Sequence, residues 1–552
     1  MNKNTLVQYG FPIMGNSTLF IVPFYYGEEN EDQSQLEQNY SVTESDSSLW
    51  TLETKMLTNE GDGSFLYPHI TSFLQGQMME SSSNVDGHLA VYSIADVDRG
   101  KNKDSKFEQR TIIRKFWNKF VRSFHTVDVG TKTEQKLLNF KFINGKHETL
   151  KPHLFIFPSA RIGLLSFGIE LISPNATTDD LKLLNYSLHK ISKPIIRCVC
   201  TGLNIVGQEN SDIRKNKSDD FNSARLFIEE HVDEKKKKEE SDVVEFSWNM
   251  KTLIDTMLKD VHGIVMTADG GKKETIVNLF TPPRIHVFTF CGIDDSIENK
   301  YCKDDILPEL YRLSRCVNDK YLLPFEEMNF KESYLQTFEN VYVASTVEGT
   351  AFIALAKEQN SKFFEGFVSI MALRYVWNYL LAVLQRYSLL NMDRMLTVLD
   401  ANDARIKAKG KNNDQEETVR RHCLMLWRLL ESVRNVKVRC HFIDISPFTQ
   451  HNEFYEHCCE KLHVSSAFDE IDHKTKALNL TMSHDLQILK EKRENNLNLF
   501  LAIFAVLQCI NIFFDLFKAF LDKEIVKAEI LSGLILISIF VVIYVFKENS
   551  KE

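Results

Sequence analysis

The chain has 552 residues, of which 43% are hydrophobic and 26% are charged, and its formal net charge is −9. Such a composition is typical of globular protein, and it excludes both a disordered chain and a transporter built mostly of membrane helices. The negative charge argues against direct nucleic-acid binding as the main activity, because nucleic-acid-binding domains are usually basic. The length allows two or three domains of roughly 150 residues each.

The first 361 residues alternate between strand and helix patterns. Runs rich in β-branched and aromatic residues predict strands at Leu19–Tyr26, His88–Ile94, Leu137–Ile143, His153–Phe157, Ile162–Ile172 and Ile285–Phe290. Helical patterns lie between them at Phe107–Phe124, Thr178–Ile191 and Asp304–Cys316. We therefore expect residues 1–361 to form an α/β or α+β cytosolic sensory domain, undivided or in two subdomains.

Residues 362–496 are predicted to form a helical bundle and a stalk. Phe363–Asn391 is strongly apolar, but its Arg374 and Asn378 favour a buried core helix over a membrane span. Glu416–Val438 follows as an amphipathic helix.

The stalk itself is expected to be one very long helix. Between Phe448 and Ser532 the chain contains neither glycine nor proline, the two residues that most often end helices. A narrow apolar seam of the kind seen between packed helices recurs at three- and four-residue steps, at Phe468, Ile471, Thr475, Leu478, Met482, Leu486 and Leu489. A continuous helix over His463–Phe517 would measure roughly 80 Å. The alternative is two helices with a polar joint near Asn495–Asn496.

Two apolar runs near the C-terminus predict a membrane hairpin. Leu499–Phe517 and Ile530–Phe546 are each close to the ~20 residues that a helix needs to cross a bilayer. We assign residues 497–517 and 530–546 to the spans, 518–529 to an outer loop and 547–552 to a cytosolic tail. The N-terminus lacks the apolar stretch of a secretory signal. We therefore expect a protein of the inner (plasma) membrane with both termini in the cytosol.

The first span carries a polar stripe. Seven-, three-, three- and four-residue steps place Asn498, Ala505, Gln508, Asn511 and Asp515 on one side of the helix. Polar side chains within a span usually face protein or water, so we expect these residues to line a pore. One hairpin cannot enclose a pore, which implies a homo-oligomer. The alternative is a plain anchor bundle with interhelical hydrogen bonds and an interfacial Asp515.

A basic cluster in the body is the expected ligand site. Arg214-Lys215-Asn216-Lys217-Ser218 precedes the helical pattern Asp219–His231, with Ser218 in the N-cap position. In the alternative interpretation, acidic residues here only complement the helix dipole. The expected ligand-binding residues are Arg214, Lys215, Lys217, Ser218 and Asp219.

We expect no enzyme, no catalytic residue and no metal site. The motifs G-x-x-x-x-G-K-[ST], G-x-S-x-G and H-E-x-x-H do not occur. Five residues could suggest zinc, namely His451, His457, Cys458, Cys459 and His463, but they lack a recognised paired ligand spacing. Core thiols and solvated helix faces explain this cluster better.

This order of parts resembles the CorA family of metal-ion transporters over Lys362–Glu552, and more loosely in the α/β body. The resemblance implies a cytosolic α/β domain, a helical bundle and a long helix that becomes the first span of a pentamer. The family's Gly-Met-Asn signature at the outer end of that span is absent, and Cys509-Ile510-Asn511 retains only the asparagine. Ordinary Mg²⁺ selectivity is therefore not implied.

A CorA-like chain with an enlarged body and no such signature is similar to the membrane effectors of type III CRISPR systems. That similarity implies a nucleotide second messenger, a conjugate of S-adenosylmethionine and AMP, as ligand, with Mg²⁺ as a further candidate. It implies antiviral defence by membrane disruption, with the lipid bilayer and copies of the same chain as partners. Two alternatives remain, a constitutive transporter of Mg, Co or Ni ions and a membrane-anchored binding protein that does not conduct.

Overall fold

The computed structural model describes part of the chain in two compact units. The described residues are 10–27, 40–42, 50–52, 65–75, 89–94, 117, 119–131, 134–143, 148–191, 195–203, 217–218, 242–259, 261, 264–267, 276–294, 303–317, 334–338, 340–356, 374–409, 415–521, 532–533, 536 and 540. The first unit comprises Met1–Met395 with Leu429–Ile471, and the second comprises Leu396–Arg428 with Asp472–Glu552.

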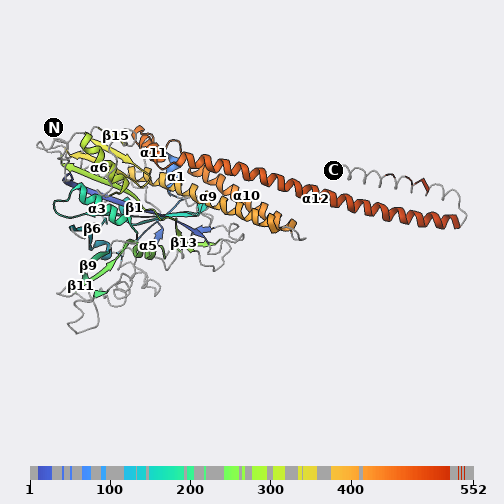
Figure 1. Cartoon of the computed structure of the whole chain (residues 1–552), viewed down its shortest axis with the longest axis horizontal. Coiled ribbons are helices and arrows are strands. Elements are labelled where there is room, and N and C mark those ends of the chain that lie inside the picture. The colour runs from blue at the N-terminus through green and yellow to red at the C-terminus, as the bar shows by residue number, and fades with distance from the viewer. Residues whose placement is uncertain are drawn as a thin grey trace. The chain divides into compact units, whose positions relative to one another are not determined.

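The first unit is built on strands that alternate with short helices (Figure 1). Its strands are β1 Ile13–Gly27, β2 Tyr40–Val42, β3 Trp50–Leu52, β4 Ala90–Ile94, β5 Phe124–Thr131, β6 Glu134–Phe142, β7 His153–Phe157, β8 Ile162–Leu171, β9 Ile196–Leu203, β10 Lys217–Ser218, β11 Asp242–Trp248, β12 Val265–Thr267, β13 Ile276–Leu279, β14 His286–Asp294, β15 Tyr334–Phe338, β16 Val341–Ser345 and β17 Gly349–Ala356. All six predicted strands are found, although β1 begins six residues before its predicted start at Leu19 and residue 88 lies outside the described residues.

Fifteen of the described strands form one mixed sheet. Its main path runs β10-β11-β9-β5-β6-β8-β1-β14-β17-β16-β15, while β13 joins β1 and a branch of β3, β4 and β7 joins β8. Most neighbours are antiparallel, but β14 pairs in parallel with β17 and β10 in parallel with β11. β2 and β12 form a separate small sheet. The body is therefore a mixed α/β domain, as the sequence predicts.

The helices of the chain are longer toward its C-terminal end. They are α1 Pro68–Gln75, α3 Thr178–His189, α5 Met250–Lys259, α6 Lys303–Arg315, α9 Val376–Lys409, α10 Gln415–Cys440, α11 Thr449–Lys461 and α12 Val464–Leu521, with short 3-10 turns η4 Glu148–Leu150 and η5 Pro158–Ala160. The predicted helices at Thr178–Ile191, Asp304–Cys316 and Glu416–Val438 are confirmed as α3, α6 and α10. Of the pattern Phe107–Phe124, residues 107–116 and 118 lie outside the described residues.

Both faces of the sheet are covered, as the central strand β14 illustrates. On one face, Asn185 of α3 donates a hydrogen bond of 2.9 Å to the hydroxyl of Thr289. On the other face, the ring of Phe288 packs against Tyr379 of α9, with centroids 5.6 Å apart. Neighbouring residues of a strand point to opposite faces, so alternate residues of β14 serve two different apolar layers. This arrangement explains why β14 has no exposed face.

The buried core helix predicted over Phe363–Asn391 corresponds to α9, which extends further toward the C-terminus than predicted. Asn378 is fully buried and its amide donates to the carbonyl of His451 at 3.4 Å, whereas its side-chain oxygen has no hydrogen-bond partner among the described residues. The helix runs to Lys409, well beyond the predicted end at Asn391, because no glycine or proline interrupts it before Gly410. Residues 363–373 of the predicted helix lie outside the described residues.

α12 confirms the predicted long helix and is continuous through Asn495–Asn496. His463, with a φ of 54°, separates it from α11. A residue in this left-handed region interrupts helical hydrogen bonding, so two helices form where the lack of glycine and proline would have allowed one. Along the predicted seam Ile471 is buried and Thr475, Leu478 and Met482 are half-buried, whereas Leu486 is exposed.

Buried neutral histidines make the body sensitive to acid. His125 is fully buried, its Nε2 donates to the Phe120 carbonyl at 3.0 Å, and its Nδ1 accepts from the Trp248 indole at 3.2 Å. Burial lowers the pKa of His125 to about 3 and that of His286 likewise to about 3. A proton on Nδ1 would displace the indole donor, so only the neutral ring fits this site.

We therefore expect acid to destabilise the protein through His125. The unfolded chain binds the proton near the ordinary pKa, so stability is lost as the pH falls below about 6.5 toward the folded value. When the pH is lowered from 7 to 5, the free energy of unfolding should fall in both proteins. The fall should be about 2 kcal/mol smaller in His125→Phe than in the wild type. Guanidinium unfolding of the full chain in detergent, followed by tryptophan fluorescence, measures this difference. The exposed His473→Gln variant is the control, and equal losses in wild type and His125→Phe would contradict the assignment.

Candidate functional site

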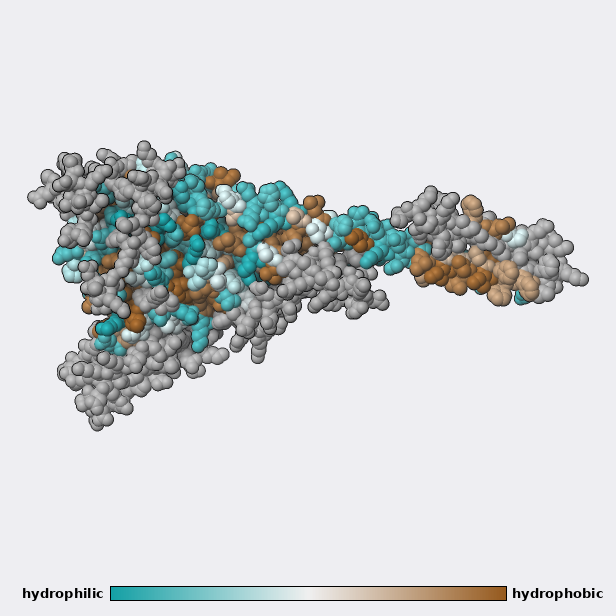
Figure 2. Space-filling view, viewed as in Figure 1, coloured by the Kyte–Doolittle hydropathy of each residue, from teal (hydrophilic) through white to brown (hydrophobic). Residues whose placement is uncertain are grey.

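By length and composition, α12 is able to cross a membrane, and its apolar window lies within Val464–Asp515. Figure 2 shows hydrophobic side chains dominating the surface of this part of α12. Phe500 is 65% exposed and Phe514 is 67% exposed. An apolar surface of this extent is a marker of contact with a membrane or a partner.

The second predicted span falls mostly outside the described residues. Of Ile530–Phe546, only Ser532, Gly533, Leu536 and Phe540 are described, and all four are helical. Residues 522–529 of the expected loop and the tail 547–552 also lie outside. Residues 518–521 belong to α12, so the first helix extends past the predicted end of the span.

Three faces can be distinguished around the apolar part of α12. One face is half-buried or buried within the chain, and it consists of Asn498, Ala502, Ala505, Cys509 and Ile512. A second, exposed face carries the polar residues Gln508, Asn511 and Asp515, with the apolar Phe504 one turn before Gln508. A third, exposed face is apolar, with Leu499, Val506, Ile510, Phe513 and Phe517. These groups follow from the rotation of about 100° per residue in an α-helix.

The predicted pore-lining residues are thus divided between two faces. Gln508, Asn511 and Asp515 lie together on the exposed polar face, where another copy of the chain could meet them. Asn498 and Ala505 lie on the half-buried face. The pore assignment of all five stays a prediction, and the first three are the ones free to face water.

The predicted basic ligand cluster is described only in part. Lys217 and Ser218 form the short strand β10, which pairs with Glu245 and Phe246 of β11. Arg214, Lys215 and Asp219 lie outside the described residues, as does the expected helix Asp219–His231. Their role in ligand binding therefore stays a prediction.

The first unit also contains a cavity of about 710 Å³. Ligand pockets commonly measure about 300–1,000 Å³. Six parts of the fold contribute to its lining: the end of α6, the turn between β16 and β17, Gln385 of α9, the residues after α10, the last turns of α11 and the first residues of α12. The cavity is therefore located where the stalk helix begins.

Three charged side chains that line this cavity, those of Arg315, Glu348 and the exposed Glu456, have no ion-pair partner among the described residues. Arg315, in the last turn of α6, is half-buried and lies 5.7 Å from the centroid of the Tyr311 ring. Glu348, in the β16–β17 turn, is half-buried as well. His189 is an electrostatic neighbour of Glu348. Burial lowers the pKa of His189, and this effect outweighs the attraction of Glu348, which raises it. Lys461, by contrast, is paired with Glu460 at 2.9 Å.

Aromatic rings and a buried polar frame complete the cavity. The rings of His441 and Phe468 lie 4.5 Å apart and connect the end of α10 to the first turns of α12. Behind them, Gln385 accepts hydrogen bonds from the Tyr455 hydroxyl at 2.8 Å and from the Cys459 thiol at 3.5 Å. Burial raises the pKa of Cys459 to about 12, so its thiol is protonated at neutral pH and is a poor nucleophile. The lining suits binding rather than covalent catalysis.

No pattern in the sequence predicts this cavity, although two of its residues stand in the candidate zinc cluster. Cys459 and His463 of that cluster line the cavity. His451 and Cys458 are instead buried in the core. In the described part of the chain, no three His, Cys, Asp or Glu side chains are placed to share a metal ion.

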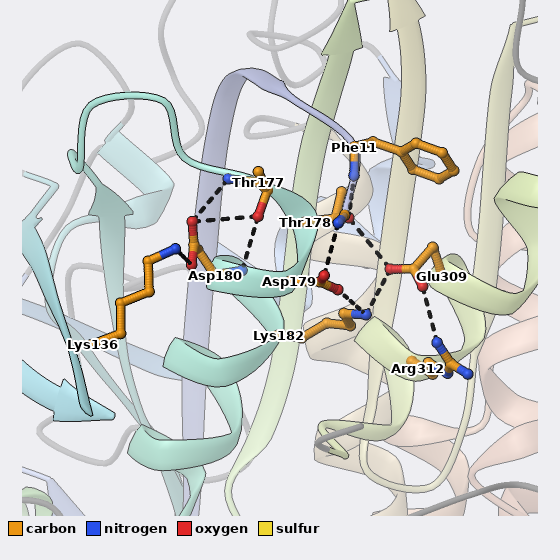
Figure 3. A network of polar contacts seen from close by, with 10 residues as sticks. Phe11, Lys136, Thr177, Thr178, Asp179, Asp180, Lys182, Glu309 and Arg312 are labelled. Atoms are coloured by element: carbon orange, nitrogen blue, oxygen red, sulfur yellow. Dashed lines mark hydrogen bonds and ion pairs between the residues drawn. The ribbon is translucent and has the colours of Figure 1, made fainter. Parts of the chain in front are cut away.

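A second polar cluster, at the start of α3, has its charges paired internally (Figure 3). The Lys182 amine, almost fully buried, lies 2.5 Å from Asp179 and 2.8 Å from Glu309. Asp179 also accepts from the Gly10 amide at 2.7 Å, and Glu309 pairs with Arg312 at 3.1 Å. This network ties the N-terminal segment, α3 and α6 together, and we regard it as structural.

Comparisons with known proteins give a distant structural similarity. No protein-family model and no curated protein sequence matches the chain. The chain is similar to the complete CorA magnesium transporter of Methanocaldococcus jannaschii at 14% identity, with a TM-score of 0.15, over 51% of this chain and 94% of that one. It is also similar to the soluble domain of that CorA at 14% identity, with a TM-score of 0.12, over 37% of this chain and 90% of that one.

Proposed function

We propose that this protein is an oligomeric membrane effector whose pore is opened by a ligand that binds the cytosolic body. The observation that carries the proposal is α12. It is a single helix that starts with residues lining a ligand-sized cavity and continues as an exposed apolar span. Because one continuous helix joins the cavity to the span, a shift of its first turn on ligand binding can be transmitted to the membrane.

The pore is proposed to form from several copies of α12, five by resemblance to the CorA family. Gln508, Asn511 and Asp515 are exposed on one face of an otherwise apolar helix. Such side chains are costly against lipid and are normally turned toward protein or water. Packing of several copies with this face inward removes that cost and encloses a polar path across the inner membrane.

The ligand is proposed to be a nucleotide second messenger, the conjugate of S-adenosylmethionine and AMP made by a type III CRISPR complex. Its binding would open the membrane and so protect the cell population from viruses. This part of the proposal comes from the resemblance given above. Ligand binding can open the pore only if the open arrangement binds the ligand more tightly than the closed one.

Reconstitution of the full chain into dye-loaded liposomes tests this function. We expect dye or ion release only when the conjugate is added, with AMP and S-adenosylmethionine separately as comparison ligands. Release of Mg²⁺ or Co²⁺ without ligand would instead indicate a constitutive cation transporter. Absence of any flux from liposomes that contain assembled protein and ligand would indicate a non-conducting binding protein and would overturn the proposal.

A further inference from the structure

The cavity at the start of α12 holds charges that the described part of the protein leaves without partners. Arg315 and Glu348 line it from two different elements, and no ion pair joins either of them to another side chain in the described residues. Removing charges from water is unfavourable unless opposite charges or hydrogen bonds replace the water. A ligand that carries both signs of charge would supply the missing partner of each residue.

The aromatic side chains that line the cavity favour a ligand with a flat ring. His441, Phe442, Phe468 and Tyr311 all contribute to the cavity. Aromatic faces and edges favour stacked or T-shaped contact with another ring. The cavity volume of about 710 Å³ leaves room for a ligand of nucleotide size.

We propose that this cavity binds a small zwitterionic ligand with an aromatic ring, its anionic group at Arg315 and its cationic group at Glu348. The inference rests on the proposed function, because it locates the site where the ligand of that function acts. The ligand would contact His463 and the first turn of α12 directly. Tightening or loosening of this turn is the step through which binding reaches the stalk.

Titration calorimetry on the full-length chain in detergent tests the inference with three probes: the conjugate, S-adenosylmethionine and AMP. We expect Arg315→Ala to weaken binding of the conjugate about 10- to 100-fold, as loss of a charged hydrogen-bond partner does. Glu348→Gln should weaken the conjugate and S-adenosylmethionine, which carry a cationic amine, but should leave AMP unchanged. Arg434→Ala, at an exposed position outside the cavity, is the matched control.

Several results would overturn the inference. Undiminished binding by both Arg315→Ala and Glu348→Gln would do so, and so would binding that is lost only in Arg214→Glu, which would support the basic cluster instead. Failure of the wild type to bind either amine-bearing probe would also reject it. The thermal midpoint of each variant shows whether it is folded, and Phe468→Ala gives a second, uncharged test of the same site.

Liposome release separates this inference from the proposed function. If Arg315→Ala loses binding while bound wild type never conducts, the site is supported and the pore function fails. If wild type conducts on addition of the conjugate and the cavity variants respond normally, the function stands and the site is wrong.

Discussion

Lys182→Met is expected to lower the free energy of unfolding by about 3–5 kcal/mol. The amine of Lys182 is enclosed between two carboxylates, those of Asp179 and Glu309, and its side chain is 1% exposed. Without this cation the carboxylates of Asp179 and Glu309, 26% and 13% exposed, would remain close together, and Arg312 would pair with Glu309 alone. Loss of one member of a buried ion pair is costly because it leaves an uncompensated charge.

The same network predicts a limit at high pH. Burial alone would lower the pKa of Lys182, but attraction to Glu309 and hydrogen bonding to Asp179 outweigh burial and raise it. A raised pKa means that the contribution of Lys182 is complete below its ordinary value of about 10.5 and is lost as the pH rises through the folded value. At neutral pH the amine of Lys182 is therefore charged.

A surface ion pair gives the matched control. Lys141 and Glu170 lie 3.1 Å apart, with side chains 44% and 41% exposed. Lys141→Met should change stability by only about 0–1 kcal/mol, since exposed pairs are screened by water. Denaturant unfolding of both variants in detergent measures the difference. Similar losses in Lys182→Met and Lys141→Met would show that the buried network contributes no more than a surface contact.

Local patterns were sufficient to predict six of the described strands and several of the longer helices. β7 and the helices α3, α6 and α10 are signalled by runs whose periodicity lies within a few consecutive residues. The long helix α12 could be predicted because a lack of glycine and proline is visible along the chain. The break at His463 was not predicted, since a single positive φ at a histidine leaves no composition signal.

The cavity could not be predicted for a different reason. Its residues come from α6, the β16–β17 turn, α9, the segment after α10, α11 and α12, which only the fold brings together. Arg315 and Glu348 stand in ordinary surroundings in the sequence, and their lack of ion-pair partners in the described structure becomes apparent only in three dimensions. The basic cluster around Arg214 was conspicuous because its charges are consecutive.

The pore hypothesis can be tested by asking which of the three faces of α12 is in contact with water. In the proposed oligomer the face with Gln508 and Asn511 meets the pore, and the face with Val506 and Ile510 meets lipid. The half-buried face is already covered within one chain and can serve neither role alone. A pore therefore requires the polar face to be hydrated, whereas an anchor bundle would bury it in interhelical hydrogen bonds.

Cysteine accessibility distinguishes these arrangements. In a Cys509→Ser parent, Gln508→Cys and Asn511→Cys are expected to react with a cationic methanethiosulfonate reagent on the order of tenfold faster than Val506→Cys, because the reactive thiolate forms only in water. Modification should also block ligand-induced ion flux across the liposome membrane in Gln508→Cys and Asn511→Cys but not in Val506→Cys. The parent without an added cysteine gives the background reaction of the cysteines elsewhere in the chain.

If Val506→Cys reacts as fast as Gln508→Cys, or if modification at Gln508 and Asn511 leaves the flux unchanged, the polar face does not line the path of the ions.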